Sequence, residues 1–266
     1  MNWFDKLINR RPKIGIALSG GATLGAAHIG VLQVLEREGI RPDFVTGTSA
    51  GALVGAIYCA GVPLDELASI FINMKWPSLI KPSLTKPIAL FDMQPMDGVI
   101  KKIIGDCEFK DLDIPFAAVS CDLMTGERVV LDKGPVAPAI RSSASVPGIF
   151  SPVEIDGRML VDGGVVDNLP VEQLRVMGAG FTIASDVSNR GETSKRPENL
   201  FEVLQTMFNI MQNRGALAGS DQCDCYIRPN VTQFSCWGFE DGQKILEEGK
   251  KAAEGALPQL TRLVRK

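Results

Sequence analysis

The sequence predicts an α/β fold in which helices cover a mainly parallel sheet. Short apolar runs bounded by Gly and Pro alternate with stretches of helical period, and the first strand, turn and helix are followed at once by a second such unit. With 266 residues, 45% of them hydrophobic, the chain has the apolar material for a large core. We therefore expect a folded protein with a single domain over residues 1–266.

The first unit spans residues 13–39. Residues 13–18 (KIGIAL) predict a buried strand, residues 19–24 (SGGATL) a glycine-rich turn, and residues 25–38 a helix closed by Gly39. A helix that starts directly after a glycine-rich turn leaves several backbone N–H groups of that turn unpaired.

The second unit has the same order. Phe44 and Val45 are predicted to end a strand, residues 47–51 to turn, and residues 52–60 to form a helix of small residues. The apolar run 45–62 approaches the length of a membrane span, but its glycines favour a buried strand, a tight turn and a buried helix. We expect no transmembrane segment.

The remaining chain continues the alternation. Helices are expected from Pro63 onward and over 95–104, 136–145, 200–212 and 240–253, and strands over 116–121, 128–131, 153–155, 159–161, 181–186 and 225–228. Asp156-Gly157 is a hairpin signal, and 188–197 is a polar loop. Residues 75–95 contain four prolines among apolar side chains, which excludes a long helix and leaves a mobile flap or a structural cover as alternatives.

Charge and composition exclude several functions. The net charge of -3 argues against a nucleic-acid partner. One histidine, His28, and six scattered cysteines give no ligand cluster, so we expect no metal and no cofactor, with His28 packed in its helix. The opening residues lack the pattern of a cleaved leader, which predicts a cytoplasmic protein.

The second turn contains a candidate nucleophile. Residues 47–51 (GTSAG) match G-x-S-x-G, in which a serine sits on a sharp strand-to-helix turn with its hydroxyl accessible. The alternative is that Ser49 simply caps the following helix.

A candidate base follows from elimination. No histidine follows Ser49, so the usual serine, acid and histidine order is excluded and a carboxylate is the remaining kind of base. Asp162, which ends a strand before two glycines, stands out among the carboxylates. A carboxyl with an ordinary pKa near 3.9 is a poor base unless it is desolvated. The alternative is a plain Asp-Gly turn.

The first turn can stabilise negative charge. In residues 20–25 (GGATLG), the N–H groups of Gly20, Gly21 and Ala22 are candidates for an oxyanion hole at the start of a helix. The Lys-Ser/Thr ending of a phosphate loop and the G-x-G-x-x-G fingerprint are both absent from this turn.

These three segments, together with residues 142–149 (SSASVPGI), occur in the order found in bacterial patatin-like phospholipases, which the chain resembles over about residues 13–186. The resemblance implies a three-layer α/β/α patatin-like fold. Beyond it, we expect residues 199–266 to form a C-terminal helical part of the same domain. The resemblance also implies Ser49 as nucleophile, Asp162 as base, and hydrolysis of fatty acyl esters of lipids or phospholipids through an acyl-enzyme.

The oxyanion turn departs from the family pattern. Many members have a third glycine and then a basic residue where this chain has Ala22 and Leu24. A hole can still form from backbone donors, but the positive side chain that would favour anionic phospholipids is missing. The alternative function is a patatin-fold regulatory or binding protein with weak or incidental esterase activity.

The N-terminus suggests a membrane contact. Trp3, Phe4, Leu7 and Ile8 precede basic residues and could form a short amphipathic element at the inner membrane surface, or a strap on the domain.

Overall fold

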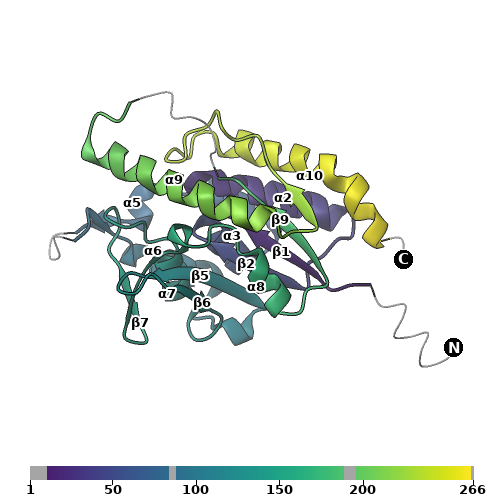
Figure 1. Ribbon diagram of the computed structural model, residues 1–266, viewed down its shortest axis with the longest axis horizontal. Coiled ribbons are helices and arrows are strands. Elements are labelled where there is room, and N and C mark those ends of the chain that lie inside the picture. Colours follow the sequence, from purple (N-terminus) through teal and green to yellow (C-terminus); the bar gives the residue numbers. More distant parts are fainter. Residues whose placement is uncertain (1–10, 84–87, 189–195, 265–266) are drawn as a thin grey trace.

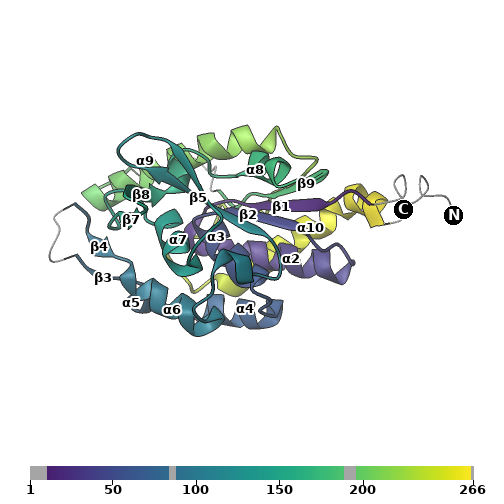
Figure 2. The same ribbon diagram turned by 90° about the horizontal axis from the view of Figure 1, so that it is seen from below.

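A computed structural model describes residues 11–83, 88–188 and 196–264, which form a twisted sheet between two layers of helices (Figure 1). Seen from the side in Figure 2, α8 (Val171–Val176) and α9 (Leu200–Ser220) cover one face, whereas α2 (Ala26–Arg37), α4 (Leu64–Ile72) and α10 (Gly242–Val264) cover the other. The expected α/β fold with a three-layer arrangement is confirmed.

The central sheet is mostly parallel, with the strand order β10-β9-β1-β2-β5-β8-β7 and β6 paired to β5. Its parallel strands are β10 (Cys225–Ile227), β9 (Phe181–Ser185), β1 (Ile14–Leu18), β2 (Phe44–Thr48) and β5 (Phe116–Asp122). The antiparallel strands are β6 (Arg128–Leu131), β7 (Val153–Ile155) and β8 (Arg158–Asp162). Because β1 pairs with β2 on one side and β9 on the other, the loops after β1 and β2 meet at the carboxyl edge.

The second unit differs from its prediction at the strand. Phe44 and Val45 begin β2 rather than end it, because Thr46 to Thr48 continue the ladders to β1 and β5. α3 (Ala50–Cys59) starts directly after Ser49, so the turn expected over 47–51 shrinks to one residue. Every residue of α3 is buried, which explains the apolar run.

The other predicted elements are present with shifted ends. The hairpin turn is confirmed by the left-handed backbone of Asp156 (φ 51°) and Gly157 (φ 75°).

The later helices differ more from their predictions. α9 and α10 extend well past their expected ends at residues 212 and 253, and α8 was not predicted. Further elements are α5 (Trp76–Leu79), α6 (Gln94–Ile104), α7 (Val136–Ser143), β3 (Lys81–Pro82), β4 (Phe91–Asp92) and the short 3-10 turns η1 (Ala22–Gly25), η2 (Phe109–Asp111) and η3 (Gly163–Val165).

Helices α10 and α2 cross at two glycines. A methyl group on Gly30 would strike the Leu246 carbonyl, and one on Gly249 would strike the Ala27 carbonyl, so only glycine permits this approach. The crossing fixes α10 beside the helix that follows η1. The loop between β10 and α10 is thereby held over the carboxyl edge of the sheet.

In the part of the chain that the structure describes, no helix combines the length and the apolar character that a bilayer crossing needs. The N-terminal residues 3–8, for which a membrane contact was predicted, lie outside the described residues, as does most of the polar loop 188–197.

Candidate active site

Ser49 occupies a strained turn between β2 and α3. Its backbone has φ 54° and ψ -118°, a conformation that side chains other than glycine seldom adopt. The Ser49 N–H donates to Ser143 Oγ (3.0 Å), whose hydroxyl donates to the Val119 carbonyl (2.6 Å). The Ser49 side chain makes no capping hydrogen bond to α3, so the alternative of a simple helix cap is wrong.

The glycines of this motif are required by close packing. A methyl group on Gly51 would strike the Leu18 carbonyl of β1, and one on Gly47 would strike the Gly51 backbone. Because both residues lack a side chain, α3 can begin in direct contact with the sheet. Ser49, between them, is then the residue with a left-handed backbone.

Asp162 lies at the same level of the sheet. Thr48 pairs with Val119 on β5, and the next residue, Ser120, pairs with Asp162. A methyl group on Gly163 would strike the Val119 carbonyl, so glycine is needed for the chain to turn here. The register of β5 therefore places the end of β8 beside the end of β2.

The Asp162 carboxyl is buried and only partly paired. Oδ1 accepts from the Gly164 N–H (2.8 Å), as in an Asp-Gly turn, whereas Oδ2 has no hydrogen-bond partner among the described residues. Burial raises its pKa from 3.8 to about 7, against the opposing effects of the Gly164 N–H and the Ser49 hydroxyl. The Ser49 hydroxyl thus lowers the pKa of this carboxyl, although the two side chains make no hydrogen bond of standard geometry. Long or poorly aligned hydrogen bonds are common in active sites without substrate.

The oxyanion turn differs from its prediction at Gly20. The Gly20 N–H donates to both Asn168 O and Asn168 Oδ1 (3.2 Å each) and is therefore already used. The N–H groups of Gly21 and Ala22 have no partner among the described residues, and both residues line a pocket beside Ser49. Ala22 has φ 50°, a left-handed conformation at the position where many family members have glycine.

The N–H of Ala50 is a further candidate donor, which the sequence motifs did not single out. Ala50 is the first residue of α3 and lines the same pocket, and first-turn N–H groups have no partner within the helix. Its position directly after the serine of G-x-S-x-G is a signal that could have identified it.

One loop holds the three parts of the site together. It runs from Asp162 to Asn168, which binds Gly20 of the oxyanion turn. Within this loop, the Asp167 carbonyl accepts from Thr48 Oγ1 (2.9 Å), and the Asp167 carboxylate pairs with Arg128 (2.6 Å). Asp162, the strand that ends before Ser49 and the glycine-rich turn at residues 20–25 are thereby fixed to one another.

His28 is fully buried behind the oxyanion turn. Its Nε2 donates to the Ser19 carbonyl (2.9 Å), which makes Nδ1 the acceptor for the Ser185 hydroxyl (2.8 Å). Burial lowers the pKa of His28 to about 4. The prediction that this histidine packs within its helix is confirmed.

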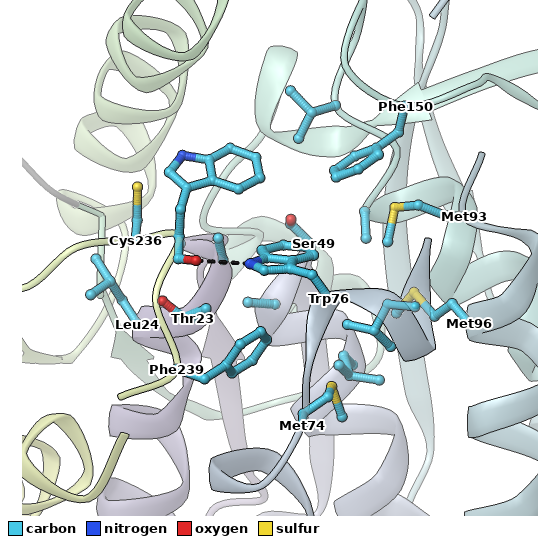
Figure 3. A pocket seen from close by; sticks show the side chains of 18 of the residues that line it. Thr23, Leu24, Ser49, Met74, Trp76, Met93, Met96, Phe150, Cys236 and Phe239 are labelled. Atoms are coloured by element: carbon cyan, nitrogen blue, oxygen red, sulfur yellow. Dashed lines mark hydrogen bonds between the residues drawn. The ribbon is translucent and has the colours of Figure 1, made fainter. Parts of the chain in front are cut away.

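An apolar pocket extends from Ser49, as Figure 3 shows, between Trp76, Phe150, Met93 and Phe239. Its lining is dominated by aromatic, methionine and other apolar side chains, namely Leu24, Leu53, Phe71, Met74, Leu79, Met96, Val146, Phe208 and Trp237 besides those four. Ser49 itself is only 6% exposed and opens into this pocket.

Two segments distant in sequence form the pocket wall. Trp76 Nε1 donates to the Trp237 carbonyl (2.8 Å), and the two indole rings lie 5.3 Å apart. The Cys236 carbonyl accepts from the Thr23 N–H (3.1 Å), which fastens the loop before α10 to the oxyanion turn. Neither contact has a local sequence signal.

The proline-rich segment 75–95 contributes Trp76, Leu79 and Met93 to this wall. Backbone hydrogen bonds from Leu90 and Phe91 to residues 148 and 149 tie its later part to the rest of the fold. Its described residues thus pack on the core and line the pocket, and the choice between a mobile flap and a structural cover stays a prediction.

Metal-binding side chains are scattered in the described part of the chain, where no group of three or more His, Cys, Asp or Glu could hold an ion. All six cysteines are free thiols, and Cys59, Cys121 and Cys225 are buried as expected, whereas Cys236 borders the pocket.

In this chain a mostly parallel sheet places Ser49 on a left-handed turn between a strand and a helix. A buried carboxyl lies beside the serine, and an apolar pocket opens from it. These features define the class of α/β proteins with a G-x-S-x-G turn. Within that class the chain belongs to the patatin-like phospholipase family, whose model matches residues 16–175.

Curated relatives include proteins of bacteria, animals and fungi. An uncharacterized NTE family protein of Mycobacterium bovis is 37% identical over 176 residues, covering 65% of this chain and 48% of that protein. A patatin-like phospholipase domain-containing protein of Caenorhabditis elegans is 32% identical (93% and 21% covered), and the lysophospholipase NTE1 of Candida albicans is 28% identical (95% and 21%). The chain spans about half the length of the mycobacterial relatives it matches.

Solved structures share the fold at low sequence identity. VipD of Legionella pneumophila superposes with a TM-score of 0.62 at 14% identity, covering 94% of this chain and 67% of that one. ExoU of Pseudomonas aeruginosa, in its complex with SpcU, gives 0.54 at 14% identity, covering 97% and 54%.

Proposed function

We propose that this chain hydrolyses fatty acyl esters of lipids through an acyl-enzyme, with Ser49 as nucleophile and Asp162 as general base. The observation that supports this most is the position of Ser49 on a left-handed turn at the base of an apolar pocket, next to a buried carboxyl whose pKa is about 7. Family membership implies lipid hydrolysis, and the dyad is the proposed means.

Acylation starts with proton transfer. Asp162 takes the hydroxyl proton of Ser49 while Oγ attacks the ester carbonyl carbon. The resulting oxyanion receives hydrogen bonds from the N–H groups of Gly21, Ala22 and Ala50, the last at the positive end of α3. Collapse breaks the bond to the alkoxy oxygen, which leaves as the alcohol with the proton from Asp162.

The raised pKa suits this role. A base is most effective when its pKa lies near the working pH, because it is then ionised and still able to hold a proton in the transition state. An Asp with its ordinary pKa would be a much weaker base, and the burial of Asp162 supplies the difference.

The pocket supports a fatty acyl substrate. Its aromatic and methionine side chains offer an apolar surface to a flexible chain, and its polar lining is confined to the end that contains Ser49 and to α9. Leu24, which replaces the basic residue of many family members, is fully buried and adds no charge. We expect no preference for anionic headgroups.

Peripheral membrane contact is part of this proposal. The outer face of α9 exposes a row of apolar side chains at heptad spacing, 40% to 68% exposed: Leu200, Val203, Met207, Ile210 and Leu217. The inner face of the same helix lines the pocket through Phe208. We infer that α9 rests on the lipid surface from which the acyl chain enters.

The test is fatty acid release from a panel of phospholipids, lysophospholipids and acylglycerols. Wild-type protein should release fatty acid, and Ser49→Ala should release none. Ser69→Ala, at an exposed serine of α4, is the matched control and should equal wild type. A folded wild type that cleaves no ester in the panel favours the regulatory or binding alternative instead.

A further inference from the structure

A polar side chain outside the family motifs projects into the site. Gln212 of α9 lines the pocket and is only 6% exposed, and it lies beyond the residues that the family model matches. Its carboxamide borders the pocket and makes no hydrogen bond with the described residues. A polar group in the lining of a largely apolar pocket is placed to bind a polar group of the ligand.

The Gln212 carboxamide occupies space that two glycines leave open. A methyl group on Gly20 would lie 2.7 Å from Gln212 Nε2 and 3.1 Å from Ser49 Cβ, and one on Gly164 would lie 3.0 Å from the same Nε2. Gln212 is therefore packed between the oxyanion turn and the turn that follows Asp162. It reaches the space next to Ser49 between these two turns, the second of which carries the proposed base.

That side of Ser49 has a defined role in the proposed chemistry. Asp162 must give its proton to the leaving alkoxy oxygen and later take one from water, and microscopic reversibility requires the two oxygens to occupy the same place. The backbone donors of Gly21, Ala22 and Ala50 face the carbonyl oxygen instead. The oxygen next to Asp162 is left without a protein partner other than the base.

We propose that the Gln212 carboxamide binds this oxygen, first the departing alcohol and then the hydrolytic water. The inference rests on the proposed acyl-enzyme function. Nε2 donates to the alkoxy oxygen as the alcohol leaves, and Oε1 accepts the hydrogen of the water that Asp162 does not take. Gln212 is thus a positioning residue whose main effect is on deacylation.

In deacylation, every proton and every broken bond is accounted for. The water oxygen attacks the acyl carbon of the Ser49 ester while one water proton moves to Asp162. The tetrahedral intermediate collapses, the bond from carbon to Ser49 Oγ breaks, and Oγ takes the proton from Asp162. The products are the fatty acid and the free serine, with no other reactant consumed.

The test separates the two half-reactions with p-nitrophenyl octanoate, whose leaving group departs without protonation. Gln212→Met keeps the length of the side chain and removes both hydrogen-bonding groups. We expect the pre-steady-state burst rate to stay within about threefold of wild type, while the steady-state rate falls by about 10-fold to 100-fold because water is no longer positioned. Mass spectrometry should then find octanoyl-Ser49 accumulating.

Gln173→Met is the matched control, because Gln173 is a buried glutamine of α8 that does not line the pocket. It should keep both rates. If Gln212→Met loses burst and steady state together, or turns over like wild type without an acyl-enzyme, the inference is wrong although the proposed function stands. If wild type shows no turnover dependent on Ser49, both are wrong.

Gln212→Glu provides a second test should Gln212→Met fail to fold. It keeps the shape and one acceptor but places a like charge near Asp162, which should move the midpoint of the pH profile for deacylation upward. An unchanged midpoint in the folded variant would contradict the placement of Gln212 beside the base.

Discussion

Replacing Asp162 by Asn should stabilise the protein in alkaline solution while disabling it. Asn keeps the shape and can still accept from the Gly164 N–H, but it has no charge to bury. The wild-type carboxyl is fully buried and its pKa is raised from 3.8 to about 7, so ionising it in the folded protein is unfavourable.

The direction in which stability changes with pH follows from proton binding at Asp162. Between the two pKa values the folded chain holds a proton at Asp162 that the unfolded chain has released, so the free energy of unfolding falls as pH rises through this window. Each pKa unit is worth about 1.4 kcal/mol, and between about pH 5 and about pH 8 the loss amounts to about 3 kcal/mol. Asp162→Asn has no carboxyl at this position, so its free energy of unfolding should not show this decrease.

The assay is urea unfolding of both proteins at the two pH values. The stability of Asp162→Asn relative to wild type should increase by about 3 kcal/mol from the lower pH to the higher, because all other groups titrate alike in both. Its ester turnover should fall by about 10²-fold to 10⁴-fold, as for loss of a general base. A stability difference that does not vary with pH would refute the burial argument.

Three further predictions concern the surroundings of the site. Ser143→Ala leaves the Ser49 N–H and the Val119 carbonyl unpaired and should lower the free energy of unfolding by about 2 kcal/mol in chemical denaturation, with reduced turnover. His28→Gln should lower the melting temperature but keep most turnover per folded molecule, since His28 is bound to Ser19 and Ser185 and not to Ser49 or Asp162; loss to the level of Ser49→Ala would contradict the dyad. Met207→Glu should weaken cosedimentation with phosphatidylcholine vesicles while leaving hydrolysis of a soluble ester unchanged.

The strands were predictable where apolar side chains alone define them. The runs at 13–18, 116–121 and 128–131 match β1, β5 and β6 within one residue. β2 was misplaced because Thr46, Gly47 and Thr48 are not apolar, although ladders on both sides bury them. Helix α8 has six residues, too few for a helical period to be recognised.

The site was predictable as far as its motifs are local. Ser49 and Asp162 were proposed from short patterns, and pairing through β5 brings their strands together. The sequence did not indicate that the Gly20 N–H already has a partner, because that partner, Asn168, lies 148 residues away. Gln212 and Trp237 reach the pocket through tertiary packing, which no spacing in their own segments indicates.

The central claim is that Ser49 is the nucleophile, and covalent labelling tests it most directly. A fluorophosphonate should react with Ser49 alone, because among the serines that the structure describes only this one combines a strained turn, a neighbouring carboxyl with a raised pKa and access from the pocket. Peptide mapping of the labelled protein should place the adduct within residues 47–51, and Ser49→Ala should abolish it. An adduct on another serine, or labelling that persists in Ser49→Ala, would contradict the account.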